Sequence, residues 1–407
     1  MMLPHLIASI NEAREIIMDP SNTENKDVAQ LRQACVSLAK DLESPTDRLL
    51  KQAFQIQDLI IARMGIQLRV FDQPQSIFGP SEVMGLSGCD YALASRTLRA
   101  LASLGLLDAT EEGMYKLNQY SKSLADGGMV RDGILLTVDL ALKMSANTIA
   151  FFEDGGYNNP ANFNRGVFQH TFGTSLSFFD WLPSQPQLQG AFNRFMEATA
   201  GEGTPAEWAL WFPIEPKLQE LYERSQKDKK ALTFVDVGGG HGHEAKAVMS
   251  RFSHLPCQFI VQDGPNYVNS HDADWEAGAK SLMKRMEYSF FDKQPVENAH
   301  VYFLGKVLHN WPDDKALQIL HNIRIAMGPD SLLLIYDWVL SDDPLDLSTE
   351  QTRDDWAMMT LFSAPERSKS GWQALLHSAN LQLVKLWESP VKNGGRWASL
   401  LEVVLKT

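Results

Sequence analysis

The sequence predicts an α/β protein with a doubly wound, mostly parallel sheet in its C-terminal half and a helical N-terminal half. Three observations predict this class. After residue 231, short apolar runs alternate with helical stretches, which is typical of a parallel sheet. Before that residue, apolar side chains recur at three- and four-residue steps, as in amphipathic helices. The 407 residues are enough for two or three domains of ~150 residues each.

Composition excludes several classes of partner. The net charge of -13 and the pI near 5.3 argue against nucleic acid, which would need a basic face. Cys35, Cys89 and Cys257 are scattered and odd in number, so they favour a reducing cytoplasm over a disulfide framework or a zinc site. The start "MMLPHLIASI" lacks a basic segment and predicts a helix, not a signal peptide. No stretch approaches the ~20 uncharged apolar residues of a membrane span, so we expect a soluble protein.

Two helices are predicted near the N-terminus. Residues 27–42 carry one apolar stripe. Ser44 is a good N-cap and Pro45 a good first residue for a second helix. The second helix is apolar on more than one face, which either burial against a partner subunit or a central place in the core would explain. Its apolar side chains include Phe54, Ile56, Leu59, Ile60, Ile61 and Met64.

Residues 81–118 predict a winged helix: a short helix, a turn at 88–90, a longer helix and a two-stranded wing around Gly113. Such a domain often binds DNA. Its second helix, however, offers only Arg96 and Arg99 on a strongly acidic protein. We therefore interpret it as an architectural, dimer-forming element, and a DNA-binding regulator is the least favoured alternative.

Residues from about 126 to 213 predict a helical bridge that a loop at 153–166 interrupts. Aromatic side chains are dense after this loop, and they suit either a hydrophobic core or an apolar pocket with a few polar groups. Candidate pocket residues here are His170, Phe179, Trp181 and Thr204.

From residue 232 the apolar runs predict strands at 232–238, 257–263, 300–304 and 331–340. Two final runs around the sequence "KNGG" predict a hairpin that completes the sheet.

A glycine-rich loop follows the first of these strands. Gly238, Gly240 and Gly242 alternate after Asp236 in "VDVGGGHGH". The dinucleotide fingerprint would need glycine at His243, and the P-loop would need a Gly-Lys-Ser/Thr ending; both are absent. The pattern D-x-G-x-G-x-G is instead that of loops that bind S-adenosylmethionine. A tight strand-to-helix turn would also favour glycine.

Asp263 ends the second strand, where a carboxylate could bind the hydroxyls of a ribose. A solvated loop acid is the alternative. His241 and His243 suggest a metal pair, but no third ligand lies nearby in the sequence, so we predict no metal site.

His309 follows the strand at 300–304, in "FLGKVLHNWPDD", and is a candidate general base. An imidazole with a pKa near ~6.5 suits proton removal at neutral pH. A lone histidine is more often structural, so its partners matter. Asp337 and Glu366 could fix its tautomer and stabilise its protonated form.

Five segments together resemble a known family: "FVDVGGGHGH", "FIVQDGP", "HVYFLGKVLHNWPDD", "LLLIYDWVL" and "DDWAMMTLFSAPERSKSGWQALLHSANLQLVKLW". They are similar to class I S-adenosylmethionine-dependent small-molecule O-methyltransferases, typified by plant caffeate and flavonoid enzymes and their relatives in fungal secondary metabolism. The resemblance implies a Rossmann-like methyltransferase sheet, S-adenosyl-L-methionine as cofactor, a small-molecule substrate and a homodimer with interlocked N-terminal helices.

The resemblance also assigns roles and domains. It implies that His309 takes a phenol or enol proton as the oxygen attacks the sulfonium methyl, and that Asp337 and Glu366 orient His309. Cofactor-binding candidates are Asp236, Gly238, Gly240, Asp263, Gly264, Ser289, Phe290 and Gly305. Substrate-side candidates are Met358, Met359 and Phe362, beside the pocket residues already named. The expected domains are 1–125 for dimerisation, 126–225 as a bridge contributing to the substrate pocket, and 226–407 for catalysis.

Three positions depart from the family pattern. Gly305 stands where relatives usually carry Arg or Lys, Ser289 where they carry Asp, and Lys306 where an uncharged residue is common. If residues 306–309 formed a helical turn, Lys306 and His309 would share a face. Its ammonium could then bind a substrate carbonyl, or it could reach solvent instead.

Lys306 raises an alternative function. Some fungal proteins of this fold bind S-adenosylmethionine without methylating and steer hetero-Diels–Alder or Alder-ene cyclisations of polyketide–alkaloid intermediates. The sequence therefore predicts methyl transfer through His309, with a pericyclase that uses Lys306 as the alternative.

Overall fold

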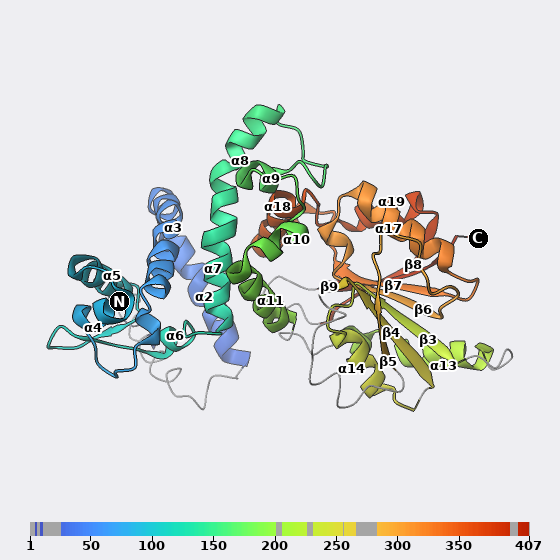
Figure 1. The fold of residues 1–407 in the computed structure, drawn as a ribbon, viewed down its shortest axis with the longest axis horizontal. Helices are drawn as coiled ribbons and strands as arrows, with labels where there is room; N and C mark the ends of the chain where they lie inside the picture. Colours follow the sequence, from blue (N-terminus) through green and yellow to red (C-terminus); the bar gives the residue numbers. More distant parts are fainter. Residues whose placement is uncertain are drawn as a thin grey trace. The chain divides into compact units, whose positions relative to one another are not determined.

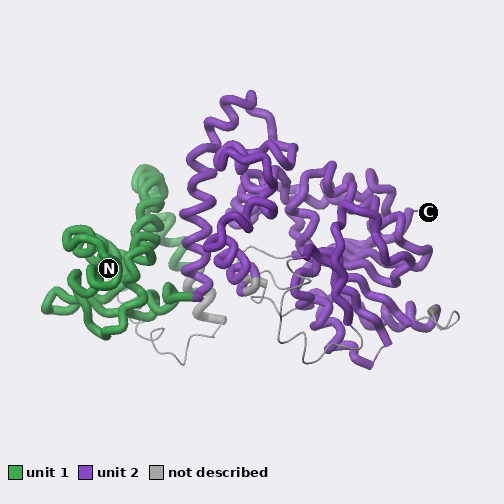
Figure 2. Tube along the Cα trace, in the orientation of Figure 1, with its two compact units in different colours: residues 1–126 green, residues 127–407 purple. Residues whose placement is uncertain are grey.

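The computed structural model describes residues 5, 9–10, 26–200, 206–225, 231–254, 256–265, 283–390 and 398–406. Most of the predicted N-terminal helix, Thr204 and the turn predicted at 392–395 lie outside these ranges. The chain forms two compact units, residues 1–126 and residues 127–407 (Figure 2).

The first unit begins with helices α2 (Lys26–Leu42) and α3 (Pro45–Gln67). The Ser44 hydroxyl accepts the Asp47 N–H at 3.1 Å, and Pro45 is the first helical residue, so the predicted start of α3 is confirmed. Large apolar side chains on α3 are exposed rather than buried in the core of this unit. They are Leu49, Leu50, Phe54, Ile56 and Ile60.

A helix–turn–helix pair and a small antiparallel sheet follow, as the sequence predicts. Gly88 ends α4 in a left-handed conformation, with φ of 72°, and the Asp90 carboxylate caps α5 by accepting the Leu93 N–H. The bounds are η2 (Val70–Asp72), α4 (Pro80–Ser87), α5 (Tyr91–Ser103), β1 (Asp108–Ala109), β2 (Tyr115–Lys116) and α6 (Gln119–Lys122).

The second unit starts with a helical segment, which runs from α7 to α13. Asp132 on α7 is buried and accepts two hydrogen bonds from Arg194 on α11, at 2.8 Å and 2.6 Å. The bounds are α7 (Met129–Leu136), π-helical η3 (Thr137–Ala141), α8 (Leu142–Gly155), α9 (Val167–Phe172), α10 (Phe178–Trp181), η4 (Leu182–Ser184), α11 (Pro186–Ala200), α12 (Trp208–Trp211) and α13 (Ile214–Ser225).

The continuous helix Met129–Gly155 is long and apolar enough to cross a membrane, with a mean hydropathy of 1.4 over its most apolar window. This corrects the expectation that no stretch approaches such a span. Charged residues interrupt the helix and hide its length from a search for an uncharged run. Length and composition do not distinguish a membrane span from a helix packed within a folded unit, and here α7 contacts α11 while α8 contacts α9.

The rest of the second unit is a seven-stranded sheet with strand order β5-β4-β3-β6-β7-β9-β8. Strands β3 to β7 are parallel, while β9 is antiparallel to both β7 and β8, so the predicted C-terminal pair completes the sheet. Strand β5 was not predicted, because the sequence of this edge strand, "MKRME", contains three charged residues and no apolar run. The bounds are β3 (Leu232–Val237), β4 (Cys257–Asp263), β5 (Met283–Glu287), β6 (Val301–Gly305), β7 (Leu332–Trp338), β8 (Leu381–Glu388) and β9 (Ala398–Leu405).

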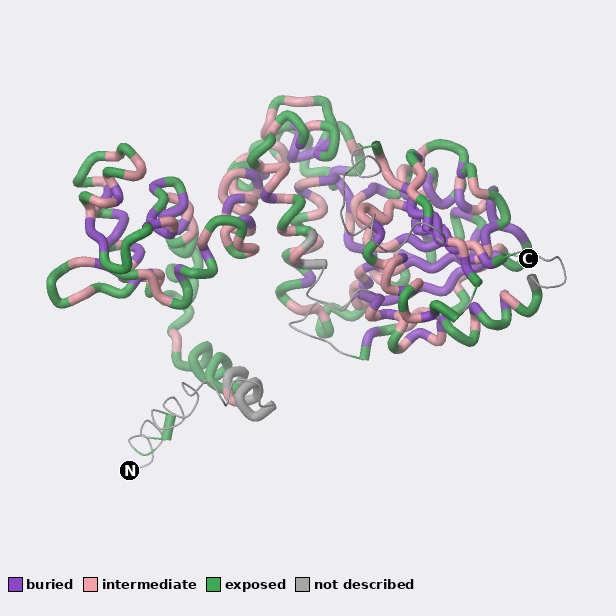
Figure 3. Tube along the Cα trace, turned by 60° about the horizontal axis from the view of Figure 1, so that its bottom comes forward, coloured by how far each residue is buried: buried purple, intermediate pink, exposed green. Residues whose placement is uncertain are grey.

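Helices cover both faces of this sheet, which confirms the predicted α/β class (Figure 1). One hydrophobic core joins the strands to α17 (Asp313–Ala326) and α19 (Lys369–Ser378). The other joins them to α12, α13 and α14 (His243–Arg251). Buried residues accordingly follow the strands (Figure 3). The remaining elements are η6 (Leu308–Asn310), η7 (Pro344–Asp346) and α18 (Thr349–Phe362).

The strand order places a switch point beside β3. The chain continues from β3 to β4 on one side, and later returns through β6 on the other. The carboxyl ends of β3 and β6 are therefore neighbours, with Asp236 paired to Phe303. Open α/β sheets bind ligands in the crevice outside such a switch point.

The Asp132–Arg194 pair yields a test of the helical segment. Asp132→Asn should lower the free energy of unfolding by about 1–3 kcal/mol, because it leaves donors of Arg194 without their charged acceptor. Chemical denaturation measures this change. The exposed pair of Glu220 and Arg224 is the control, and Glu220→Gln should change stability by less than about 0.5 kcal/mol. Equal effects of both substitutions on the free energy of unfolding would contradict the conclusion that the Asp132–Arg194 pair stabilises the helical segment.

Candidate active site

The glycine loop after β3 lies against the loop after β6. Gly238, Gly240 and Gly242 have φ angles of 73°, 54° and 76°, a region that side chains other than glycine seldom adopt. A Cβ atom at Gly238 would also lie 2.8 Å from Cγ2 of Val307. Both constraints explain why this turn needs glycine.

Three carboxyl groups surround this loop. Asp263 at the end of β4 accepts the N–H groups of Gly240 at 2.8 Å and Gly264 at 2.6 Å. Glu244, in the first turn of α14, accepts hydrogen bonds from the Trp208 indole at 2.7 Å and the Ala206 N–H at 3.0 Å. Asp236 at the end of β3 is buried, and among the described residues its Oδ2 has no hydrogen-bond partner.

Burial makes these carboxyl groups unusual acids. Burial raises the pKa of Asp236 to about 8, and the nearby charges of Glu244 and Asp263 add to the effect. Burial also raises the pKa of Glu244 and of Asp263, although both accept hydrogen bonds that act in the opposite direction. A buried acidic cluster beside a side-chain-free cradle fits S-adenosylmethionine, whose sulfonium is a cation and whose ribose presents hydroxyls to a carboxylate.

The other cofactor candidates lie at the same edge of the sheet, Ser289 and Phe290 after β5 and Gly305 at the end of β6. Ser289 is exposed, while the Phe290 ring is half-buried with its centroid 5.5 Å from that of Trp311. At Gly305 a Cβ atom would lie 2.8 Å from the ring of Phe303. Phe303 in turn stacks on Trp208, so this chain has filled with aromatic rings the space that a longer side chain at residue 305 would need.

His309 lies in the short turn η6, directly after β6. Its Nδ1 atom is 2.9 Å from Oε1 of Glu366 and 3.7 Å from Oδ1 of Asp337, which lies near the end of β7. The Asp337 carboxylate also accepts the backbone N–H of His309 at 3.2 Å. Both acids are buried, and the His309 side chain is 12% exposed. The sequence predicted this convergence, and the structure brings the three side chains together.

The two carboxylates control the protonation of His309. Burial alone lowers the pKa of the imidazole, but the charge of Asp337 and the hydrogen bond and charge of Glu366 outweigh it, and the net pKa is raised from 6.5. Burial raises the pKa of Glu366, while its contact with His309 acts in the opposite direction. An ionised Glu366 only accepts hydrogen bonds, so it would place the hydrogen on Nδ1 and leave the lone pair on Nε2. This arrangement suits a general base.

Lys306 corrects one expectation. Its φ of 54° is left-handed and η6 begins only at Leu308, so residues 306–309 do not form one helical turn. The Lys306 ammonium instead lies 5.6 Å from the centroid of the Trp338 ring. Its charge still acts on the site, because it opposes both the raised pKa that burial gives Glu244 and the raised pKa of His309.

The ring and carboxylate atoms of His309, Asp337 and Glu366 also lie within 4.8 Å of one another, as a divalent cation site would require. From the sequence, only His241 and His243 were candidates for a metal. At 2.9 Å, the contact between His309 and Glu366 is already a hydrogen bond that uses the Nδ1 of the imidazole.

The aromatic and methionine candidates differ in how far they are buried. Phe179 is 38% exposed and stacks on the buried Phe362 with ring centroids 5.4 Å apart. Trp181 packs instead against Phe168 and Phe172, in the core of the helical segment. Met358 and Met359 are half-buried on α18, and His170 is exposed beside Phe151.

Comparisons with known proteins agree with this geometry. Residues 218–382 match the family model of the O-methyltransferase domain. The O-methyltransferase mfmE of Annulohypoxylon moriforme is 31% identical over 310 residues, which are 75% of this chain and 72% of that protein. The chain belongs to the O-methyltransferase family.

Two solved structures are similar over nearly the whole chain. LepI in complex with S-adenosylmethionine has a TM-score of 0.80 and 25% identity, and the match covers 98% of this chain and 99% of LepI. A protein described as a pericyclic reaction enzyme has the same TM-score of 0.80 and 25% identity, with coverage of 98% and 100%. The chain is therefore similar both to a protein named an O-methyltransferase and to one described as a pericyclic reaction enzyme.

Sequence reasoning missed two side chains at this candidate site, Trp311 and Glu244. The centroid of the Trp311 ring lies 4.5 Å from that of Phe163, 5.5 Å from that of Phe290 and 6.3 Å from that of Phe179. Trp311 therefore lies between the cofactor candidate Phe290 and the substrate candidate Phe179. Its place two residues after His309 was the available signal. Glu244 gave a weaker signal, an acid four residues after Gly240, because nothing in the sequence shows that it is buried.

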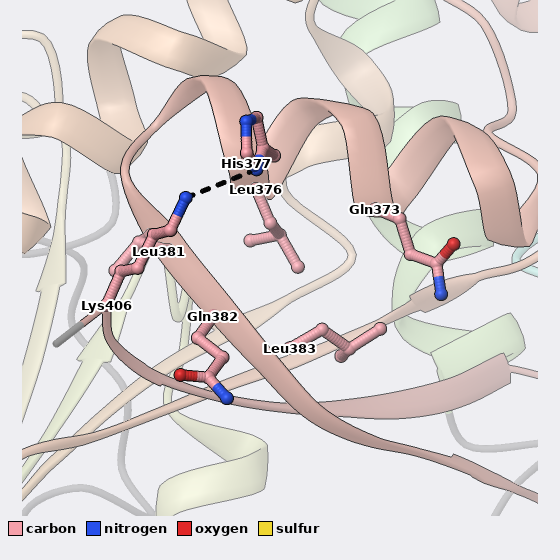
Figure 4. A pocket seen from close by; sticks show the side chains of 7 residues that line it. All are labelled: Gln373, Leu376, His377, Leu381, Gln382, Leu383 and Lys406. Atoms are coloured by element: carbon pink, nitrogen blue, oxygen red, sulfur yellow. Dashed lines mark hydrogen bonds between the residues drawn. The ribbon is translucent and has the colours of Figure 1, made fainter.

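A separate hollow of about 240 Å³ lies between α19, β8 and the end of β9 (Figure 4). His377 and Lys406 face each other there at 3.5 Å. Because β9 is antiparallel to β7, its end at Leu405 lies at the edge of the sheet opposite to Asp337. The hollow is thus not part of the active site, which makes His377 a suitable control residue for tests of that site.

The buried Asp236 yields a test by pH. Its pKa is about 8 in the folded chain against 3.8 for an ordinary aspartate, so between these values the folded chain holds a proton that the unfolded chain has lost. This group therefore makes the free energy of unfolding fall as pH rises from 4 to 8, by up to about 1.4 kcal/mol per pH unit.

Asp236→Asn should remove that dependence. We expect the stability of the cofactor-free variant to fall less between pH 5 and pH 8 than that of the unsubstituted protein, as measured by chemical denaturation. Asp330→Asn is the control, because the Asp330 side chain is 66% exposed. Parallel stability profiles for Asp236→Asn and the unsubstituted protein would contradict the burial argument.

Proposed function

We propose that this protein transfers a methyl group from S-adenosylmethionine to a phenol or enol hydroxyl of a small secondary metabolite, with His309 as general base. The observation that carries the proposal is the 2.9 Å hydrogen bond between His309 and Glu366 at the sheet edge where the glycine loop lies. The raised pKa of His309 and the buried Asp337 beside it support the same role.

The cofactor is S-adenosylmethionine, and its sulfonium supplies an electrophilic methyl group when it is bound. Asp263 and the Gly238–Gly240 backbone would hold its adenosyl part, while its cationic part would stabilise the ionised forms of Asp236 and Glu244. The buried Asp236 oxygen, which lacks a partner among the described residues, supports this assignment. Phe290 supplies an apolar surface beside these groups.

His309 would remove the hydroxyl proton at Nε2, which leaves a nucleophilic substrate oxygen. Glu366 holds the opposite ring nitrogen, so the imidazole cannot rotate, and together with Asp337 it stabilises the imidazolium that forms. Correct placement of the oxygen supplies much of the remaining rate enhancement.

The substrate would be flat or aromatic. The exposed face of Phe179, stacked on Phe362 and near Trp311, offers a surface against which such a molecule can pack. Met358 and Met359 of α18 would supply adaptable apolar contacts. In this proposal residues 126–225 contribute the substrate wall and residues 226–407 the catalytic groups.

We further propose a cytoplasmic homodimer. The exposed apolar side chains of α3, including Phe54 at 64% exposure and Leu49 at 66%, support burial against a second copy. Cys35, Cys89 and Cys257 are unpaired, as in a reducing compartment. The acidic net charge gives no support for a nucleic-acid partner.

A pericyclase is the second candidate function. Lys306 supports it, because a cation near His309 could donate a hydrogen bond to a substrate carbonyl, and so does the likeness to the protein described as a pericyclic reaction enzyme. In that case the bound cofactor would keep its methyl group. The intact set of His309, Asp337 and Glu366 favours methyl transfer.

One assay separates the two functions. The full-length protein is incubated with methyl-labelled S-adenosylmethionine and a panel of phenolic, enolic and polyketide–alkaloid compounds, and product mass is followed. We expect one added methyl group and release of S-adenosylhomocysteine. His309→Ala should reduce the rate by about 10²–10⁴-fold, while His377→Ala should not.

A product of unchanged mass that disappears with Lys306→Ala but not with His309→Ala would instead establish the pericyclase. Loss of activity on treatment with a chelator, restored by a divalent cation, would show that His309, Asp337 and Glu366 bind a metal instead of serving proton transfer.

The pH profile tests the role of Glu366. A general base acts when neutral, so kcat/KM should rise with pH through the raised pKa of His309. Glu366→Gln removes a charge that raises this pKa, and the rising limb should therefore move to lower pH as the maximum falls. Glu350→Gln, an exposed position on α18, is the control. An unmoved limb in Glu366→Gln would rule out this coupling.

A further inference from the structure

Arg367, the residue after Glu366, is buried beside the active-site turn. Its side chain is 3% exposed and lies over the ring of Trp372, with the guanidinium carbon 5.3 Å from the ring centroid. A buried guanidinium is stable only when its N–H groups have acceptors. The position of those acceptors therefore shows what the residue does.

The guanidinium donates to both ends of the turn that carries His309. Nη1 donates to the carbonyl of Leu308 at 2.9 Å, and Nη2 donates to the carbonyl of Trp311 at 2.8 Å. Nε and Nη2 both donate to Oδ1 of Asp313, at 3.0 Å and 2.8 Å, at the start of α17. A single rigid fork thus joins the turn η6 to the helix that follows it.

Neighbouring contacts fix Arg367 itself. Its carbonyl accepts the Leu340 N–H at 3.0 Å, and the Leu340 carbonyl accepts the Lys369 N–H at 3.2 Å, just beyond the end of β7. On the other side, the Glu366 N–H donates to Asp355 of α18 at 2.8 Å. The segment 366–367 is therefore held against β7 and α18 while it binds η6.

Two consecutive residues consequently hold His309 in two ways. Glu366 binds the imidazole, and Arg367 binds the backbone on either side of it. The distance between the ring and the Glu366 carboxylate depends on the position of η6, which the Arg367 fork determines. The charged groups that act on His309 and Glu366 are Asp337 from β7 and Lys306, which follows β6. Asp354 and Asp355 of α18 lie beside Glu366.

We propose that Arg367 is a positioning residue that keeps the His309 imidazole within hydrogen-bond distance of Glu366, and so keeps His309 basic. The proposal rests on the proposed function for its catalytic meaning. The contacts it invokes exist in the protein without cofactor or substrate, so it can be tested without an activity assay.

The test measures the titration of His309 by mass spectrometry, as the pH dependence of hydrogen–deuterium exchange at the imidazole C2 position in the peptide that contains it. The variant is Arg367→Lys, which keeps the positive charge but cannot reach both carbonyls. We expect the midpoint for His309 to move down toward that of an ordinary imidazole, and kcat to fall about tenfold while the Kd for the cofactor is unchanged. Arg224→Lys on α13, where the Arg224 side chain is 53% exposed, is the matched control and should not move the His309 midpoint.

Circular dichroism establishes that Arg367→Lys is folded. If it is not, Asp313→Asn replaces it, because the Asp313 side chain is 69% exposed and its removal spares the core. That variant is titrated at about 0.5 M salt, where a direct effect of the lost exposed charge is screened, and it should move the midpoint in the same direction by less. An unmoved His309 midpoint in the folded variant would overturn the proposal.

Failure of the proposed function gives a different result. If His309→Ala kept full methyl transfer, the base assignment would be wrong, whatever the titration of His309 in Arg367→Lys. If His309→Ala lost activity and the His309 midpoint did not respond to Arg367→Lys, only the positioning role would be wrong.

Discussion

The hydrogen bond between Nδ1 of His309 and Oε1 of Glu366 is the contact on which the proposed chemistry depends. It joins residues 57 positions apart, and the sheet makes it possible. Parallel strands end at one edge, so β6 delivers His309 and β7 delivers Asp337 to the same place. Glu366 reaches them from the segment after α18, which is tied to the end of β7 by the bridge of Leu340 and Ser368.

Two adjoining sites with different electrostatics follow from this arrangement. Around the glycine loop, burial favours the neutral forms of Asp236, Glu244 and Asp263, so a cationic ligand would stabilise their ionised forms. Around His309, two carboxylates favour the protonated imidazole despite its burial. The charge of Lys306 acts on both sites. It opposes the raised pKa of Glu244 beside the glycine loop and the raised pKa of His309.

Much of the fold and the site was predictable because the signals are local. Strand-forming runs, the cap at Ser44 and the glycine loop each depend on a few adjacent residues, and sheet topology then placed His309 near Asp337. Three features were beyond such reasoning. Edge strand β5 lacks an apolar run, the left-handed backbone of Lys306 broke the expected turn, and the fork of Arg367 depends on carbonyls more than fifty residues away. Tertiary packing determines all three.

The tautomer of His309 tests the central claim most directly. In protein labelled with ¹⁵N-histidine, the ring nitrogens of His309, identified by comparison with His309→Gln, report which atom carries the hydrogen. We predict that, above the pKa of His309, the neutral ring carries its hydrogen on Nδ1, with Nε2 unprotonated and free to accept a substrate proton. A neutral ring with its hydrogen on Nε2 would contradict this, because the base would then face Glu366 instead of the substrate.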